Sequence, residues 1–269
     1  MSHPRHILSL SGGKDSAALA IYMRDRVPEM EYVFCDTNKE LPETYEYLNR
    51  IEAHLGKQII RIEAPRGFDH WLTLFQGYLP SVQVRWCTTK LKLEPFEKYV
   101  GDEPVINYVG LRADEDRDAR ISHKANITVV YPFKDDSVNY AGVQKILLES
   151  GIGLPPYTEW GRSRSGCYFC FFQQAIEWVR LLETHPDLFD LAEKYETQSN
   201  DIKGGLFQWN DSMPLRELRK PESVAGIKQR HADYRQKAWK RRPNKKLVET
   251  MAGLEDEDTG PRGCNICHL

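Results

Sequence analysis

Apolar and polar positions along the first part of the chain follow the pattern of strands that alternate with helices. Short apolar runs at 7–10, 32–35 and 58–62 have the length of buried strands. Residues 17–23 have helix-forming composition, and a second helix opens at Pro42 with Tyr45, Leu48, Ile51 and Leu55 at helical spacing. This alternation predicts an α/β fold with a doubly wound, mostly parallel sheet.

The remaining sequence predicts a longer run of helices. Residues 85–92 open a helix that runs toward Tyr99, 105–111 read as another strand, and 131–133 as a short strand or turn. Helices are predicted at 138–148, 175–183 and 186–197, and part of the basic segment 228–246 also has helical character. We therefore expect an α/β domain over residues 1–200 and a helical, basic extension with a cysteine-containing tail over 201–269.

Composition narrows the class of protein. The chain has 269 residues, of which 41% are hydrophobic and 11% aromatic, so it predicts a packed globule rather than disorder. A net charge of −2 gives no global attraction to polyanions, and any such binding needs local patches. No apolar run reaches membrane-spanning length and no signal peptide precedes the first strand, so we expect a cytoplasmic protein.

The segment 11–16, Ser-Gly-Gly-Lys-Asp-Ser, lies between the first strand and the first helix. A strand, a glycine turn and a helix start direct backbone N–H groups and the positive end of a helix dipole at one point, which predicts a phosphate site. Gly12 and Gly13 permit positive φ, and Lys14 adds a positive charge. Hydroxyl groups come from Ser9, Ser11 and Ser16. The alternative is an ordinary tight turn that caps a helix.

Two further strand ends carry polar candidates. Asp36 follows the second strand, where it predicts a role toward a nucleotide or Mg²⁺; a turn or helix-capping aspartate is the alternative. Arg112 follows the strand at 105–111 and is expected to neutralise phosphate oxygens. A surface salt-bridge cluster with the acidic residues 114–116 is its alternative.

Six cysteines in a reducing compartment favour metal binding or thiol chemistry over disulfides. Cys87, Cys167 and Cys170 converge if the loop before Cys167 folds back over the carboxyl edge of the sheet. Three thiolates suit a [4Fe-4S] cluster with one open iron, or zinc with a fourth ligand; reduced thiols are the alternative. The role of Cys264 and Cys267 stays open: they could supply a fourth cluster ligand, a mobile redox pair or a sulfur-accepting thiol.

The basic segment interleaves cations with aromatic residues. Such a segment binds nucleic acid through phosphate contacts and base stacking, although a solvated helix face is the usual explanation of a charge run. The candidate nucleic-acid-binding residues are Arg235, Lys237, Trp239, Lys240, Arg241 and Arg242.

The order of the motifs resembles a known family. Ser-Gly-Gly-x-Asp-Ser is similar to the PP-loop of ATP pyrophosphatases. Cys-Thr-x-x-Leu-Lys from Cys87, Gly-x-Arg-x-x-Glu from Gly110 and Gly-Cys-x-x-Cys from Gly166 follow it in the order of the phosphoadenosine phosphosulfate (PAPS) reductase family. The resemblance covers roughly residues 5 to 185 by this motif comparison.

This resemblance implies ATP and Mg²⁺ as ligands and cleavage between the α- and β-phosphates. It implies catalysis by Lys14, Asp15 and Arg112. The implied nucleotide-binding residues are Ser9, Ser11, Gly12, Gly13, Lys14, Asp15, Ser16 and Asp36. The closest resemblance is to the Ssp and Dnd enzymes of DNA phosphorothioation, which implies a cysteine desulfurase as sulfur donor, DNA as acceptor and other modification-complex subunits as partners.

Three other functions stay open. A sulfonucleotide reductase would use Cys264 or Cys267 as nucleophile, but it has no β,γ-pyrophosphate to hold, so the complete loop favours the ATP-cleaving branch. A tRNA sulfurtransferase would share the ATP chemistry and differ in its acceptor. A non-catalytic nucleic-acid-binding subunit would release no pyrophosphate at all.

Overall fold

The computed structural model describes residues 3–116, 124–203, 207–210 and 212–240. Within these ranges the strands form one sheet of order β3-β2-β1-β4-β5, in which all neighbouring strands are parallel. The strands are β1 (Arg5–Leu10), β2 (Glu31–Asp36), β3 (Ile59–Glu63), β4 (Val105–Tyr108) and β5 (Ile127–Val130). The strand order reverses between β1 and β4, which confirms the predicted doubly wound α/β fold.

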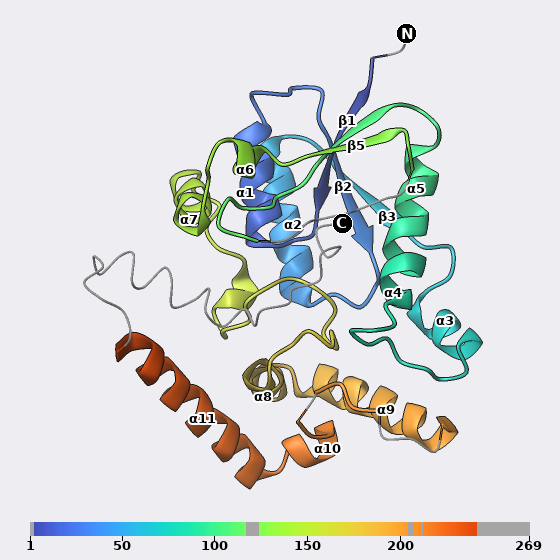
Figure 1. Cartoon of the computed structure of the whole chain (residues 1–269), viewed down its shortest axis with the longest axis vertical. Helices are drawn as coiled ribbons and strands as arrows, with labels where there is room; N and C mark the ends of the chain where they lie inside the picture. The colour runs from blue at the N-terminus through green and yellow to red at the C-terminus, as the bar shows by residue number, and fades with distance from the viewer. Residues whose placement is uncertain (1–2, 117–123, 204–206, 211, 241–269) are drawn as a thin grey trace.

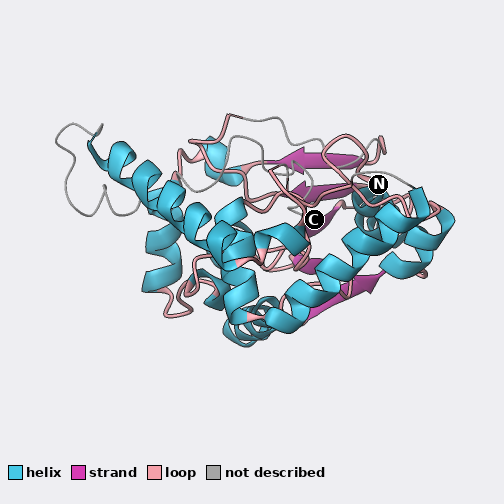
Figure 2. Cartoon of the chain, turned by 90° about the horizontal axis from the view of Figure 1, so that it is seen from below, coloured by secondary structure: helices cyan, strands magenta, loops and turns pink. Residues whose placement is uncertain are grey.

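Helices cover both faces of this sheet, as Figure 2 shows. Because side chains alternate along a strand, Leu8 and Leu10 pack on one face against α1 (Lys14–Met23), α2 (Pro42–Leu55) and α7 (Tyr140–Glu149). Ile7 and Cys35 pack on the other face against α5 (Glu94–Val100). Burial on both faces explains why the strands read as continuous apolar runs.

A third apolar cluster lies beyond the carboxyl edge of the sheet. It joins Phe68 and Trp86 to Trp178, Trp209 and Ile227, so residues on both sides of position 200 pack together. The expected domain boundary at that position stays a prediction.

The remaining elements are α3 (Phe68–Leu74), α4 (Trp86–Thr88), the π-helical η1 (Thr89–Leu93), α6 (Pro132–Asp135), the 3₁₀ turn η2 (Pro156–Thr158), α8 (Ala175–Thr184), α9 (Pro186–Lys203), α10 (Leu215–Leu218) and α11 (Pro221–Lys240).

Figure 1 shows that β1 and β2 point their carboxyl ends toward the loop that connects η2 to α8. Helices α8 to α11 lie on the far side of this loop, and α11 extends away from the body of the molecule. The predicted helical region after residue 175 is therefore confirmed through residue 240. None of the helices in the described ranges combines the length and the apolar character that crossing a membrane requires.

Several predicted elements differ from the observed ones. The strand predicted at 105–111 ends at Tyr108, and β5 and α3 were not predicted. Residues 131–133 do not form a strand or turn, because Pro132 begins the short helix α6 at the position where proline best fits a helix. Cys35 is a buried thiol within β2, as expected, and burial raises its pKa to about 11.

Candidate functional site

The loop between β1 and α1 lies at the point where the strand order reverses, the usual ligand position in this architecture. Gly12 has φ +70°, and a Cβ on it would lie 2.5 Å from Thr44 Cγ2 of α2. Gly13 is the N-cap of α1 with φ −92°, so the positive φ predicted for both glycines is found at Gly12 alone. The first-turn N–H groups of an α-helix lack intrahelical acceptors, so those of α1 are candidates to bind an anion.

The serine hydroxyls stabilise the loop from within. Ser16 Oγ accepts the Ser11 N–H at 3.1 Å and donates to the Gly13 carbonyl at 3.2 Å. Ser11 Oγ accepts the Gly13 N–H at 3.3 Å. Ser9 lies within β1, before the loop, and its hydroxyl donates to Asn107 Oδ1 of β4 at 2.9 Å. These contacts fix the shape of the loop and tie it to the sheet.

The two predicted cations meet at this loop. Lys14 and Arg112 are both buried, and both contact the ring of Tyr140 at the start of α7. Lys14 Nζ lies 4.5 Å from the ring centroid and Arg112 Cζ lies 5.1 Å from it. Cation–π contacts of this kind stabilise buried positive charge. The structure thus brings Lys14, Asp15 and Arg112 together, as the sequence predicted, around a tyrosine that it did not.

Arg112 is held by carboxylates. Its guanidinium donates to Asp15 Oδ1 at 3.1 Å and Asp114 Oδ1 at 3.0 Å, and Glu115 Oε1 lies 3.2 Å away. The alternative interpretation, a salt-bridge cluster, therefore describes the observed contacts of Arg112, with Asp15 as an added member. A phosphate group at this site would compete with these carboxylates for the guanidinium.

The loop at 159–174 folds back over the carboxyl edge of the sheet, which is the condition stated above for the three cysteines to converge. Tyr157 OH in η2 donates to the Gly12 carbonyl at 3.4 Å, and Ser165 Oγ lies 3.5 Å from Ser11 Oγ. Arg162 is buried and organises the loop by donating to Gln173 Oε1 at 2.6 Å and the Cys167 carbonyl at 2.9 Å. This loop closes one side of the phosphate site.

Asp36 forms a turn at the end of β2. Its Oδ1 accepts the Asn38 N–H at 2.7 Å and the Tyr45 hydroxyl at 2.8 Å. The turn interpretation therefore accounts for this oxygen, and the carboxylate is buried. A role toward nucleotide or Mg²⁺ stays a prediction.

The same strand end presents a second polar group that the sequence analysis did not single out. Thr37 Oγ1 donates to Glu40 Oε1 at 2.9 Å and lies 3.2 Å from Cys167 Sγ, which is 3.8 Å from the same carboxyl oxygen. Burial raises the pKa of the Cys167 thiol well above its ordinary value, and Glu40 raises it further. Burial also raises the pKa of Glu40, against the opposing effect of nearby Lys92.

The structure describes all three cysteines of the predicted metal centre, Cys87, Cys167 and Cys170. No group of three or more His, Cys, Asp or Glu side chains in the part of the chain that the structure describes has the arrangement of a metal site. Cys167 and Cys170 share a turn in which the Cys170 N–H donates to the Cys167 carbonyl at 3.0 Å, while Cys87 lies half-buried on α4. An iron–sulfur or zinc centre stays a prediction, and Cys264 and Cys267 lie outside the described residues.

The predicted nucleic-acid-binding residues are only partly described. Arg235 and Lys237 are exposed on α11, and Trp239 and Lys240 belong to its last turn. Arg241 and Arg242 lie outside the described residues. The mostly exposed surface of α11 fits either a solvated face or a binding face.

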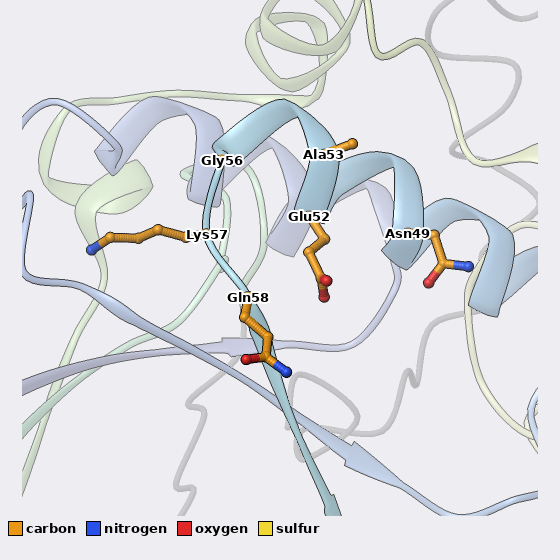
Figure 3. A pocket seen from close by; sticks show the side chains of 6 residues that line it. All are labelled: Asn49, Glu52, Ala53, Gly56, Lys57 and Gln58. Carbon is orange, nitrogen blue, oxygen red and sulfur yellow. The ribbon is translucent and has the colours of Figure 1, made fainter.

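A surface hollow of about 490 Å³ lies at the other edge of the sheet (Figure 3). It is lined by the last turns of α2 and by residues that lead into β3, including Glu52 and Lys57. Glu52 Oε2 accepts the Ile59 N–H at 3.0 Å, and Lys57 Nζ donates to the Met30 carbonyl at 3.2 Å. The charged groups of both side chains therefore hold the backbone in place. Because ligands in this fold bind at the carboxyl ends of strands, the hollow is not the candidate site.

Four residues at the site were missed from sequence. Tyr140 and Ser165 reach the loop only through tertiary contacts, so no local pattern marked them. Thr37 and Glu40 did carry a signal, since polar residues directly after a buried strand gather at the carboxyl edge of a parallel sheet.

Comparisons with known proteins agree with this geometry. Residues 5–170 match the phosphoadenosine phosphosulfate reductase domain family. A crystal structure of the PAPS reductase from Candida auris, a phosphate complex, superposes with a TM-score of 0.50 and 14% identity, over 62% of this chain and 82% of that one. This likeness shows the fold.

Three curated relatives carry the name of uncharacterised proteins. Two proteins of Methanocaldococcus jannaschii are 27% and 25% identical over 76% and 79% of this chain, but over only 45% and 54% of their own length. The chain thus spans about half the length of these archaeal relatives. A 37.8 kDa protein of Escherichia phage 186 is 26% identical over 71% of this chain and 74% of its own length.

Proposed function

The chain belongs to the phosphoadenosine phosphosulfate reductase domain family, and from this premise we propose that it is an ATP pyrophosphatase that activates an acceptor oxygen for sulfur incorporation. ATP, with Mg²⁺, binds at 11–16 in this proposal. The acceptor is a nucleic-acid phosphate, with the DNA backbone favoured over tRNA. A cysteine desulfurase supplies the sulfur, and further modification-complex subunits act with the chain.

The observation that carries the proposal is the convergence of Lys14, Arg112 and the N-terminus of α1 on one loop. Lys14 and the helix N-terminus favour a negatively charged ligand, and Arg112 can join them when a phosphate group displaces one of its carboxylate partners. A triphosphate meets that requirement better than a single carboxylate does.

The chemistry follows from where charge develops. An acceptor phosphate oxygen attacks the α-phosphorus of ATP, the bond to the bridging oxygen of the β-phosphate breaks, and pyrophosphate leaves with the bond electrons. Lys14 and the first-turn N–H groups of α1 stabilise the charge on the leaving pyrophosphate, and Arg112 orients the α-phosphate. The terminal sulfur of the persulfide on the cysteine desulfurase then attacks the acceptor phosphorus and releases AMP. A thiol reductant cleaves the resulting S–S bond and becomes a disulfide with the desulfurase cysteine, which leaves sulfur on the acceptor in place of one oxygen.

The membership itself favours a second candidate, a sulfonucleotide reductase. That activity needs a nucleophilic thiol, for which Cys264 and Cys267 are the predicted candidates. Sulfite released from PAPS in the presence of thioredoxin, without pyrophosphate release from ATP, identifies this function. Pyrophosphate release with each acceptor in turn, DNA, tRNA or none, identifies the first.

Substitution of Lys14 tests the proposed ATP site. We expect Lys14→Ala to lower the rate of AMP and pyrophosphate formation by about 100-fold or more, because it removes a charge that stabilises the transition state. Lys145→Ala on the exposed face of α7 is the matched control and keeps the wild-type rate. A Lys14→Ala rate within tenfold of the wild type contradicts the assigned role.

A further inference from the structure

Two segments that are far apart in the sequence form a cationic, aromatic surface beside the phosphate loop. The segment 70–93 contributes Arg85, and the segment 160–176 contributes Arg164 and Phe172. Arg85 Cζ lies 5.0 Å and Arg164 Cζ lies 5.3 Å from the centroid of the Phe172 ring. Figure 1 shows the chain between α3 and α4 beside the loop that precedes α8.

The positive charge of this surface is uncompensated. Arg85 donates to the Val82 carbonyl at 3.1 Å and Arg164 to the Phe172 carbonyl at 2.6 Å, both acceptors without formal charge. Neither guanidinium forms an ion pair with a carboxylate within the described residues. Both segments also lack aspartate and glutamate throughout. An anion that reaches this surface meets two arginines and no opposing acid from the same segments.

Exposed aromatic and aliphatic side chains lie on the same segment as Arg85. Phe75 stacks on Trp86, with centroids 5.2 Å apart, and keeps 36% of its surface exposed. Tyr78 is 44% exposed, and Val82 and Val84 are exposed on the same segment. Exposed rings beside arginines are the features with which proteins hold unpaired bases.

The surface is connected to the candidate ATP site by two residues that are neighbours in the sequence. Arg164 precedes Ser165, whose Oγ lies 3.5 Å from Ser11 Oγ in the phosphate loop. Adjacent Cα atoms are about 3.8 Å apart, so the backbone of this surface lies beside the loop, while the Arg164 guanidinium itself lies over Phe172.

From these contacts we infer that the surface around Arg85, Arg164 and Phe172 binds a single-stranded segment of nucleic acid. The arginines contact backbone phosphates, Phe75 and Tyr78 stack on unpaired bases, and one phosphate of the strand lies beside the phosphate loop. The inference rests on the proposed function for the identity of the acceptor. It assigns strand binding to this surface rather than to the basic residues of α11.

The test measures binding of a fluorescein-labelled single-stranded DNA 20-mer by anisotropy, without ATP, at several salt concentrations. The Arg85→Ala/Arg164→Ala variant is expected to bind roughly tenfold more weakly. The slope of log K against log salt should become less steep by about 0.7 for each phosphate that the variant no longer binds. Arg24→Ala, at the end of α1 remote from the loop, is the control and should bind like the wild type.

Three results overturn the inference: no strand binding by the wild type, equal binding by the double variant, or a weakening that occurs only in Arg235→Ala/Lys237→Ala on α11. A protein-docking role for the exposed apolar residues would give the second of these. Photo-crosslinking of a bromouracil-substituted strand to the wild type removes dependence on variant folding. Crosslinks in 74–86 and 160–173 support the surface, and crosslinks confined to other peptides overturn it.

The two proposals fail separately. Because the binding assay contains no ATP, strand binding that depends on Arg85 and Arg164 stands even if no pyrophosphate is ever released. Conversely, pyrophosphate release by a protein whose strand binding ignores both arginines leaves the ATP site intact and removes this surface.

Discussion

Both cations of the phosphate site contact one ring, that of Tyr140, at 4.5 Å for Lys14 Nζ and 5.1 Å for Arg112 Cζ. Each cation–π contact contributes about 0.5–2 kcal/mol, depending on how far the charge is desolvated. Tyr140 begins α7 and is itself buried, with 6% of its surface exposed, which restricts the movement of the ring. The ring therefore positions two charges that approach the phosphate loop from different elements.

Replacement of this ring should weaken ATP binding more than it slows catalysis. We expect Tyr140→Leu to raise the KM for ATP about tenfold, because neither cation then has an aromatic face to hold it in position. Tyr140→Phe keeps the ring and should leave KM within about twofold, although it removes the hydrogen bond from Gln144 to the hydroxyl. Steady-state kinetics of pyrophosphate release measures both. Equal KM values for the two variants count against a positioning role.

Among single residues, the sequence predicted those whose neighbours in the chain indicate a ligand site. Lys14 and Asp15 lie in a strand-loop-helix motif, and Arg112 follows a strand, so position alone marked them. Tyr140 is an ordinary helix residue until the fold brings α7 beside α1. The carboxylates around Arg112 were visible in sequence, but their geometry decides that they hold the guanidinium.

The phosphate loop depends on its neighbour α2 for its shape. Gly12 adopts positive φ, and the space where its Cβ would lie is filled by Thr44 Cγ2 at 2.5 Å. Backbone strain and steric overlap are separable here, because one belongs to the loop and the other to the helix.

We expect Gly12→Ala to lower the free energy of unfolding by roughly 2–4 kcal/mol, the sum of the φ strain and the overlap. Adding Thr44→Ser removes the Cγ2 methyl and should restore the part that comes from overlap, about 1–3 kcal/mol. Urea unfolding of the wild type, both single variants and the double variant measures each part. No coupling between the two substitutions would mean that the overlap is absent.

Among the elements, periodicity predicted those with strong patterns. Strands β1 to β3 and helices α1, α2, α7, α8 and α9 have clear apolar runs or helical spacing. Strand β5 was missed although its four residues, Ile127–Val130, are all β-branched, which is a strand signal in the sequence. The prediction at 131–133 was wrong as well. Pro132 is typical of a turn in its local sequence, but in the structure it begins the helix α6.

At the scale of the whole molecule, the sheet and the C-terminal helices are joined by a polar contact as well as by an apolar cluster. Glu43 Oε1 near the start of α2 accepts Trp160 Nε1–H at 2.9 Å and lies 2.6 Å from His185 Nε2 at the end of α8. Sequence could not predict this contact, because its three members come from distant segments. The order of elements predicted the sheet but not how the helices after residue 175 dock on it.

Glu43 makes this docking dependent on pH. Burial alone would raise the pKa of Glu43, but hydrogen bonds from its own backbone N–H, His185 and Trp160 lower it below its ordinary value of about 4.5. A carboxyl whose pKa is lowered on folding stabilises the protein above its unfolded pKa, and that stabilisation is lost as pH falls through the folded value.

The pH profile of Glu43→Gln therefore tests the docking contact. At pH 7 we expect the variant to lose roughly 1–2 kcal/mol of unfolding free energy, because charged hydrogen bonds become neutral ones. The difference from wild type should hold down to about pH 5 and shrink below pH 4.5, where the wild-type carboxyl also becomes protonated. Glu31 and Asp69, whose pKa values are also lowered, are present in both proteins and cancel in the comparison. Urea unfolding across this range measures the difference, and one that stays constant to pH 3 would show that Glu43 does not titrate in this contact.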